Sequence, residues 1–205
     1  MPARLAGSGE VGGGKSSPAL RVRALTQCLP EVLAALPPSR PLELSSTSFS
    51  FRVPPGSIGG RKPLRFVAQM DTADHGTGSR LWVGGLLLAE WLWQQHCFDD
   101  RGPILGQSVL ELGAGFCGLP SCVAAKTGAL KVTATDGIEK VVTQLQGNAG
   151  PIGVEVRKLI WGMEDAPATY QSIADVILFA DCVYSERCAE LLLQSIGHYR
   201  ERAPG

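Results

Sequence analysis

The segment Ser108–Asp136, SVLELGAGFCGLPSCVAAKTGALKVTATD, constrains the fold of this chain more than any other. It reads as a strand, a glycine-rich turn, a helix and a second strand that ends on an acid. Gly113 permits a tight turn, Gly115 lets a ligand approach the backbone, and Gly118 lets the following helix pack against the strand. Such a turn holds a nucleoside at the carboxyl ends of parallel strands, where Asp136 is placed to accept hydrogen bonds from both ribose hydroxyls.

Strands and helices alternate through the rest of the chain, which predicts an α/β fold built on a parallel sheet with right-handed crossovers. Two strands joined by a Pro/Gly-rich loop and one long helix come first. The expected strands are 47–53, 64–69, 108–112, 131–135, 154–160 and 175–180, and the expected helices are 79–96, 118–127, 138–148 and 185–200.

The amino-terminal region is expected to be an extension of the folded domain. Residues 1–18 are rich in Gly, Ser and Pro, which predicts disorder, and 20–36 fits an amphipathic helix. Residues 9–16 match the phosphate-loop pattern GxxxxGK[ST], but no strand precedes them and Pro18 follows, so we interpret the match as a coincidence. We therefore divide the chain into an extension, 1–40, that is disordered or partly helical, and a domain, 41–205.

Composition narrows the class of protein. Hydrophobic residues at 44% and charged residues at 19% indicate a soluble globular chain, and the amino terminus lacks a signal-peptide core. No apolar run is long enough to span a membrane, and the six cysteines show no metal-ligand spacing, so we expect reduced thiols in the cytoplasm or nucleus. Residues 66–205 carry an excess of six negative charges, which favours a basic protein partner over nucleic acid, although an ordinary solvated surface explains it more simply.

Three features favour S-adenosylmethionine over NAD as the nucleoside cofactor. Glu111 would repel a pyrophosphate, whereas a cofactor with a sulfonium and an ammonium group tolerates that charge. Trp161 follows the third strand of the alternating region, where an indole either lies against an adenine ring or fills the end of the core. Asp181 and Tyr184 end the fourth such strand, where active sites of open sheets lie, although an acid there also suits a helix cap.

Five segments together resemble the family-16, or methyltransferase-like, protein-lysine methyltransferases, which have a seven-strand sheet. They are LWVGGLLLAEWL (81–92), VLELGAGFCGLP (109–120), VTATD (132–136), LIWG (159–162) and FADCVY (179–184). The resemblance implies a Rossmann-like class I fold, a three-layer αβα sandwich. It also implies a pocket for S-adenosylmethionine lined by Trp82, Gly113, Ala114, Gly115, Asp136, Trp161 and Ala180. We add Glu111 to the cofactor site because of its charge, and the cysteine spacing predicts no metal.

The resemblance also implies an acceptor site. The family's acid-x-x-aromatic motif corresponds to Asp181–Tyr184, beside the target lysine of a protein substrate. We expect Asp181 to orient the neutral amine for attack on the methyl group, and Tyr184 to pack against the methylated cation.

The chain stops after the helix that follows FADCVY, whereas a seven-strand methyltransferase continues through three further strands. We therefore expect a fold that lacks its carboxyl-terminal strands and leaves 175–180 as an apolar edge; a complete protein is expected to be monomeric. The alternatives are a methyltransferase for a small molecule or another protein side chain, a non-catalytic cofactor-binding fragment, and last a nicotinamide dehydrogenase.

Overall fold

The computed structural model describes residues 46–69, 77–163 and 174–201. The predicted amino-terminal helix at 20–36, the phosphate-loop match at 9–16 and Cys28 lie outside these described residues, so the division of the chain at residue 40 stays a prediction.

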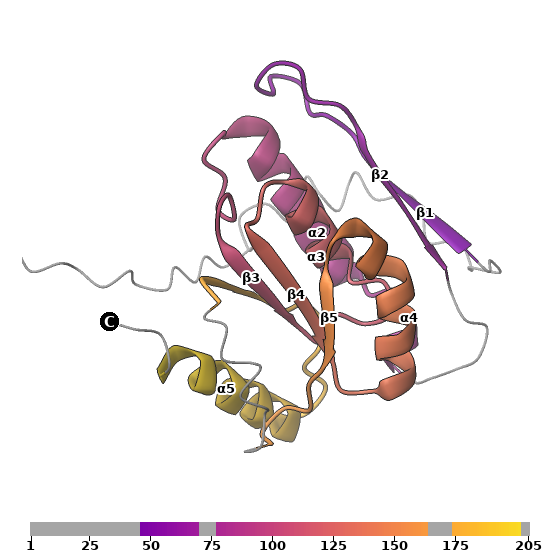
Figure 1. Cartoon of the computed structure of the whole chain (residues 1–205), viewed down its shortest axis with the longest axis vertical. Coiled ribbons are helices and arrows are strands. Elements are labelled where there is room, and N and C mark those ends of the chain that lie inside the picture. Colours follow the sequence, from indigo (N-terminus) through magenta and orange to yellow (C-terminus); the bar gives the residue numbers. More distant parts are fainter. Residues whose placement is uncertain (1–45, 70–76, 164–173, 202–205) are drawn as a thin grey trace, which may run out of the picture.

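Four parallel strands form the central sheet in the order β5-β4-β3-β6 (Figure 1). Their bounds are Ser108–Leu112 for β3, Lys131–Asp136 for β4, Glu155–Lys158 for β5 and Val176–Leu178 for β6. Burial is almost continuous along β3 and β4, as expected for strands covered on both faces. The prediction of an α/β fold with a parallel sheet is confirmed.

Helices cover both faces of this sheet. On one side lie α2 (Val83–Phe98), α3 (Leu119–Lys126) and α4 (Glu139–Ala149), which share one apolar cluster, and on the other lies α5 (Glu186–Glu201). Side chains of β3 alternate between the two: Val109 joins the first cluster, whereas Leu110 and Leu112 join the second. The predicted three-layer αβα arrangement is thus present.

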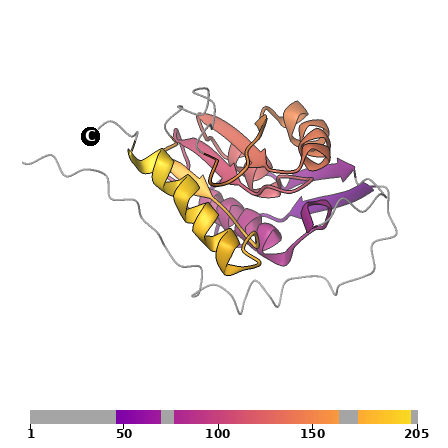
Figure 2. The ribbon, with the colours of Figure 1, turned by 90° about the horizontal axis from the view of Figure 1, so that it is seen from below.

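A two-stranded antiparallel sheet precedes this core. It consists of β1 (Ser46–Phe51) and β2 (Leu64–Gln69), and it lies on the opposite side of the molecule from α5 (Figures 1 and 2). Its inward side chains alternate along each strand, and the rings of Phe51 and Phe66 meet edge to face at 6.1 Å. The main-chain oxygen of Arg52 accepts a hydrogen bond from the indole of Trp93 in α2 at 2.7 Å.

Asn148 of α4 joins this two-stranded sheet to the glycine turn. Its buried side-chain amide donates to the main-chain oxygens of Gln69 and Phe116, both at 2.9 Å, and its side-chain oxygen accepts from the Gln69 amide at 2.8 Å. One side chain therefore fixes the end of β2 against the turn that follows β3.

The differences from the sequence prediction are mainly differences of boundary. The predicted helix 79–96 starts at Val83 instead, because Trp82 is extended and a short 3-10 turn, η2 (Thr77–Ser79), precedes it. The predicted strand 175–180 shortens to β6, which lies beside β3 at the edge of the four strands described. That the fold lacks its carboxyl-terminal strands stays a prediction. Among the described helices, none combines the length and the apolar character needed to cross a membrane.

Candidate functional site

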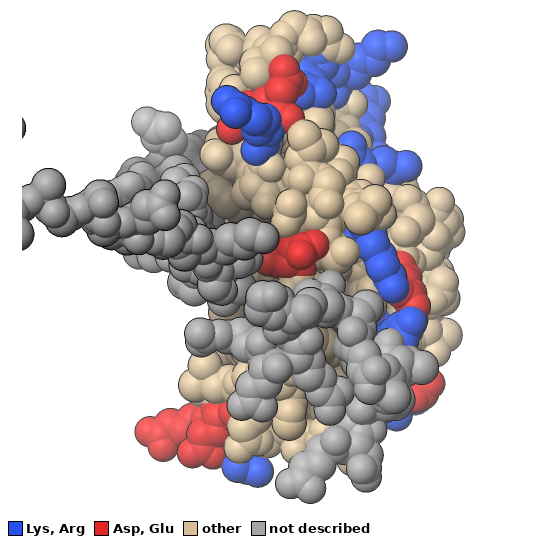
Figure 3. All heavy atoms as spheres, turned by 60° about the vertical axis from the view of Figure 1, so that its left-hand side comes forward, with Lys and Arg blue, Asp and Glu red and all other residues tan. Residues whose placement is uncertain are grey.

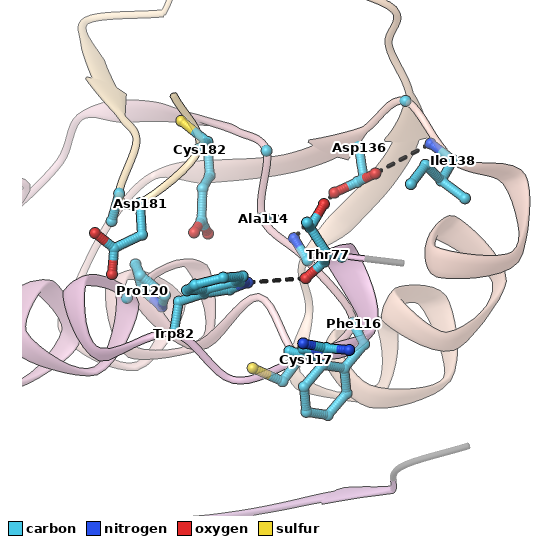
Figure 4. Close-up of a pocket in the computed structure, with 18 of the residues that line it drawn as sticks. Thr77, Trp82, Ala114, Phe116, Cys117, Pro120, Asp136, Ile138, Asp181 and Cys182 are labelled. Atoms are coloured by element: carbon cyan, nitrogen blue, oxygen red, sulfur yellow. Dashed lines mark hydrogen bonds between the residues drawn. The ribbon is translucent and has the colours of Figure 1, made fainter. Parts of the chain in front are cut away.

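A cavity of about 360 Å³ lies at the carboxyl ends of the parallel strands, where ligands bind in open α/β sheets (Figure 4). Its walls come from the ends of β3, β4 and β6, the turn after β5, η2 and the start of α2. All ten residues that the sequence singled out line it: Trp82, Glu111, Gly113, Ala114, Gly115, Asp136, Trp161, Ala180, Asp181 and Tyr184.

The glycine turn supplies main-chain groups to the centre of the cavity. Gly113 and Gly115 have φ angles of 71° and 65°, which L side chains rarely adopt. A Cβ atom at Gly113 would lie 3.0 Å from the Cβ of Cys182 and 3.1 Å from the indole of Trp161. The turn therefore passes close to two neighbouring segments, and a side chain at this position would crowd both of them.

Asp136 lies at one end of the cavity, where β4 finishes (Figure 4). One carboxylate oxygen accepts a hydrogen bond from the Gly115 amide at 3.2 Å and the other from the Ile138 amide at 3.0 Å. The side chain is only 8% exposed, and this burial raises its pKa, against the lowering effect of the amide bonds. Since each carboxylate oxygen has further acceptor capacity, Asp136 is fixed in place and still able to bind hydroxyl groups.

Glu111 borders the same cavity but is almost wholly enclosed, with 3% of its surface exposed. Its Oε2 accepts from the Ser121 amide at 3.0 Å and from the Ser121 hydroxyl at 2.5 Å, so the carboxyl group lies at the amino-terminal turn of α3. Burial raises its pKa to about 7. We expected Glu111 to contact the cofactor. In the structure its carboxylate accepts hydrogen bonds from Ser121.

Trp161 and Ala180 follow β5 and β6, and both are half-buried. The indole of Trp161 lies beside Gly113 and belongs to the apolar cluster that faces α5. Trp161 therefore fills the end of the core, one of the two roles considered above, and it also lines the cavity, where contact with an adenine ring stays a prediction.

The other end of the cavity is formed by Trp82, Asp181 and Tyr184. The Trp82 and Tyr184 rings are 6.1 Å apart at 48°, with 39% and 54% of their surfaces exposed. The Trp82 indole donates to the main-chain oxygen of Thr77 at 2.8 Å, which sets the ring plane. The pKa of Tyr184 is raised by partial burial, and a side-chain hydrogen bond with Thr77 opposes that effect.

Asp181 is exposed and has a backbone φ of 50°, the one positive value at a non-glycine residue in the described part of the chain. Its Oδ2 accepts a hydrogen bond from the Gly84 amide at 2.5 Å. Gly84 is the second residue of α2, whose first amides have no partner within the helix. The sequence analysis considered Asp181 as a cap for the helix that follows it. In the structure its carboxylate instead binds a free amide at the start of α2, much earlier in the chain.

Comparison with known proteins decides the family. A sequence profile described as lysine methyltransferase matches residues 61–204. The chain belongs to the lysine methyltransferase family.

Individual relatives of this lysine methyltransferase family member carry different names. EEF1A lysine methyltransferase 3 of Mus musculus is 34% identical over 129 residues, which are 60% of this chain and 51% of that protein. Protein N-lysine methyltransferase METTL21A of Danio rerio is 41% identical over 130 residues, 60% of this chain and 56% of that one. Diaminohydroxyphosphoribosylamino-pyrimidine deaminase of Schizosaccharomyces pombe is 29% identical over 154 residues, 71% of this chain and 37% of that one. The chain thus spans about half the length of these curated relatives.

The cavity of this chain is also lined by residues that the sequence analysis did not single out. Thr77 and Gly78 come from the short η2 turn, and the Gly78 oxygen accepts from the Phe116 amide at 2.9 Å, which fixes η2 over the glycine turn. Nothing in their local pattern distinguishes them from loop residues. Ile138 has a recognisable signal, because it lies two residues after the acid that ends β4.

The cysteines that line the cavity are thiols. Burial raises the pKa of Cys117 to about 12 and that of Cys182 to about 11, so neither is a ready nucleophile. The third, Cys188, has its pKa lowered, mainly by a hydrogen bond with the Ser185 side chain. The described part of the chain brings no three His, Cys, Asp or Glu side chains into a group that fits a metal ion.

Proposed function

We propose that this chain is the methyltransferase domain of an enzyme that uses S-adenosylmethionine to methylate the side-chain amine of a lysine in a protein substrate. The observation that carries the proposal is the convergence, in one cavity, of the glycine turn, Asp136 and the acid-x-x-aromatic motif that ends in Tyr184. The family membership supports it, as do the two relatives named as lysine methyltransferases. The match to the yeast deaminase covers 37% of that protein, and its named activity is not carried over.

The residues at the buried end of the cavity fit a nucleoside. Gly113 lines the cavity with main chain alone, since a Cβ there would crowd Cys182 and Trp161, and Asp136 is held with acceptor capacity to spare for ribose hydroxyls. Trp161 offers a half-buried aromatic edge beside the turn. When bound there, S-adenosylmethionine would supply a methyl group on a positively charged sulfur.

The residues at the exposed end fit the acceptor. Asp181 would accept a hydrogen bond from the lysine amine and orient its lone pair, which attacks only when the nitrogen has lost its extra proton. Trp82 and Tyr184 line the cavity as a pair of partly exposed rings, and aromatic rings attract an alkylated ammonium group. The roles of all three residues are part of the proposal.

The surface agrees with a protein partner. On the face drawn in Figure 3, described Lys and Arg side chains gather along the upper right edge, both signs are present elsewhere, and much of the surface is uncharged. A single-sign basic surface, the usual mark of a nucleic-acid partner, is not formed by the described residues of that face. A protein partner and a cytoplasmic or nuclear location stay predictions.

Two measurements test the proposal. Calorimetric titration with S-adenosylmethionine, S-adenosylhomocysteine and NAD should give binding of the first two and none of NAD, and the reverse result would restore the dehydrogenase alternative. Radiolabelled methyl transfer into a cell lysate, followed by peptide mapping, should place the label on lysine. Label on another side chain, or on a small molecule, would overturn the assignment of the acceptor.

A further inference from the structure

The carboxylate of Asp181 is held by Gly84, which lies 97 residues earlier in the chain, at the second position of a helix. Its Oδ2 accepts the hydrogen bond from the Gly84 amide, in the first turn of the 16-residue helix α2. Free amides at a helix start carry partial positive charge and attract anions. The carboxylate that we propose orients the lysine amine is therefore itself oriented by the protein before any amine arrives.

The contact depends on the size of residue 84. A Cβ atom built at Gly84 would lie 2.6 Å from Cγ and Oδ2 of Asp181 and 2.8 Å from Oδ1, closer than real contacts of Cβ atoms. Any residue other than glycine would therefore push the carboxylate away from its present place. Because the carboxylate is the far end of a rotatable side chain, it can move without disturbing the backbone.

The backbone of Asp181 adds a second sign that this orientation is imposed. A φ of 50° is unfavourable for a residue with a side chain, although Asp tolerates it better than most. Such conformations persist where neighbouring structure fixes them, and they gather at functional sites. Here the parallel pairing of β6 with β3 fixes the chain just before Asp181, and the Gly84 amide fixes its side chain.

We propose that Gly84 is a positioning residue for methyl transfer: its amide and its missing side chain hold Asp181 where the acceptor amine must be oriented. This inference rests on the proposed function and adds to it a residue that does not itself touch the acceptor. Preorganised polar groups of this kind lower a barrier because they need no rearrangement when the reaction occurs.

The test compares Gly84→Ala with Gly147→Ala. Both replace a helical glycine with alanine, which has the higher helix propensity. Gly147 lies within α4, away from the cavity, and a Cβ there meets no atom within 4 Å. The pair therefore separates displacement of Asp181 from the general effect of the substitution.

We expect Gly84→Ala to lower kcat by about 30-fold, by analogy with small misplacements of reacting groups. Its affinity for S-adenosylmethionine should stay within about twofold of the wild type, and its melting temperature should not fall. Gly147→Ala should match the wild type in kcat and affinity. A folded Gly84→Ala enzyme with wild-type kcat would overturn the inference, as would an equal loss of kcat in both variants.

A readout without catalysis keeps this inference separate from the proposed function. Hydrogen exchange of the Gly84 amide, followed by NMR, should be about tenfold slower in the wild type than in Asp181→Ala, because one charge-assisted bond is lost. If the wild type transfers no methyl group to any lysine, the proposed function fails, and this measurement still decides whether Gly84 holds Asp181. Equal exchange in the two proteins would contradict the inference.

Discussion

The two ends of the cavity use the same residue type in opposite environments. Asp136 ends one parallel strand and Asp181 follows another, and both bind the amide of a residue at the start of a helix. Asp136 is buried and bonded through both oxygens, whereas Asp181 is exposed and has one such bond and a strained backbone. The comparison teaches that burial, more than residue type, separates the acid proposed to bind a cofactor from the acid proposed to meet an incoming substrate.

The largest effect should come from the exposed end. We expect Asp181→Ala to lower the rate of methyl transfer by about a thousandfold, because the amine loses the group that orients it. Affinity for S-adenosylmethionine should change by less than about twofold, since Asp136 and the glycine turn are untouched. Steady-state transfer assays and calorimetry measure the two quantities. Full activity in this variant would show that the assigned role is wrong.

The next prediction concerns Glu111, at the buried end of the cavity, and how the free energy of unfolding depends on pH. Burial raises the pKa of Glu111 from 4.5 to about 7, so between these values the folded protein binds a proton that the unfolded chain does not. The free energy of unfolding should therefore decline by about 3 kcal/mol as the pH rises from 4.5 to 7, then level off.

Glu111→Gln should remove most of that decline, and the raised pKa of Asp136 leaves a smaller slope of the same sign. Urea unfolding of both proteins at several pH values gives the two curves, and their shape is the readout. Curves of equal slope would mean that Glu111 titrates normally in the folded protein.

Asp136→Ala should weaken the binding of S-adenosylmethionine by about 30-fold, because two hydrogen bonds to a charged group are lost. Asp136→Asn is the control, since it keeps one oxygen acceptor and should lose less affinity. Calorimetry on both variants measures the difference. If both bind as the wild type does, the ribose contact is not made by this side chain.

The smallest effect is expected for Trp161→Phe. An aromatic ring remains beside Gly113, and only part of the contact area is lost, so affinity for the cofactor should fall by about threefold. The same titration measures it, with the melting temperature as a check on the core. A loss as large as that of Asp136→Ala would mean that the indole is a principal cofactor contact.

The fold and the residues that line the cavity could be predicted because both follow from the local sequence pattern and the sheet topology. Alternating strands and helices require a parallel sheet, and the carboxyl ends of its strands meet at one edge, so Gly113, Asp136 and Asp181 had to converge. The partners of the acids were harder to predict. Asp181 binds Gly84 across 97 residues, and such pairings depend on how helices lie over the sheet rather than on spacing.

The start of α2 shows the same limit. The apolar pattern extends the helix back to Ser79, but Trp82 turns outward from the helical path and its indole binds the main chain of Thr77. A tertiary contact therefore overrides the local preference. Ser121 is a contrasting case, since its position in the first turn of α3, ten residues after Glu111, could have suggested the pairing.

Asn148 has a consequence for exchanging parts between relatives. The side-chain hydrogen bonds of Asn148 connect β2 to the glycine turn. The two-stranded sheet at 46–69 is therefore structurally coupled to the cavity. A chimaera that takes this sheet from another family member must bring a matching main-chain partner for Asn148, or leave a buried amide unsatisfied beside the turn. Substrate-exchange experiments are therefore best made with the junction before Ser46, keeping the sheet with its own turn.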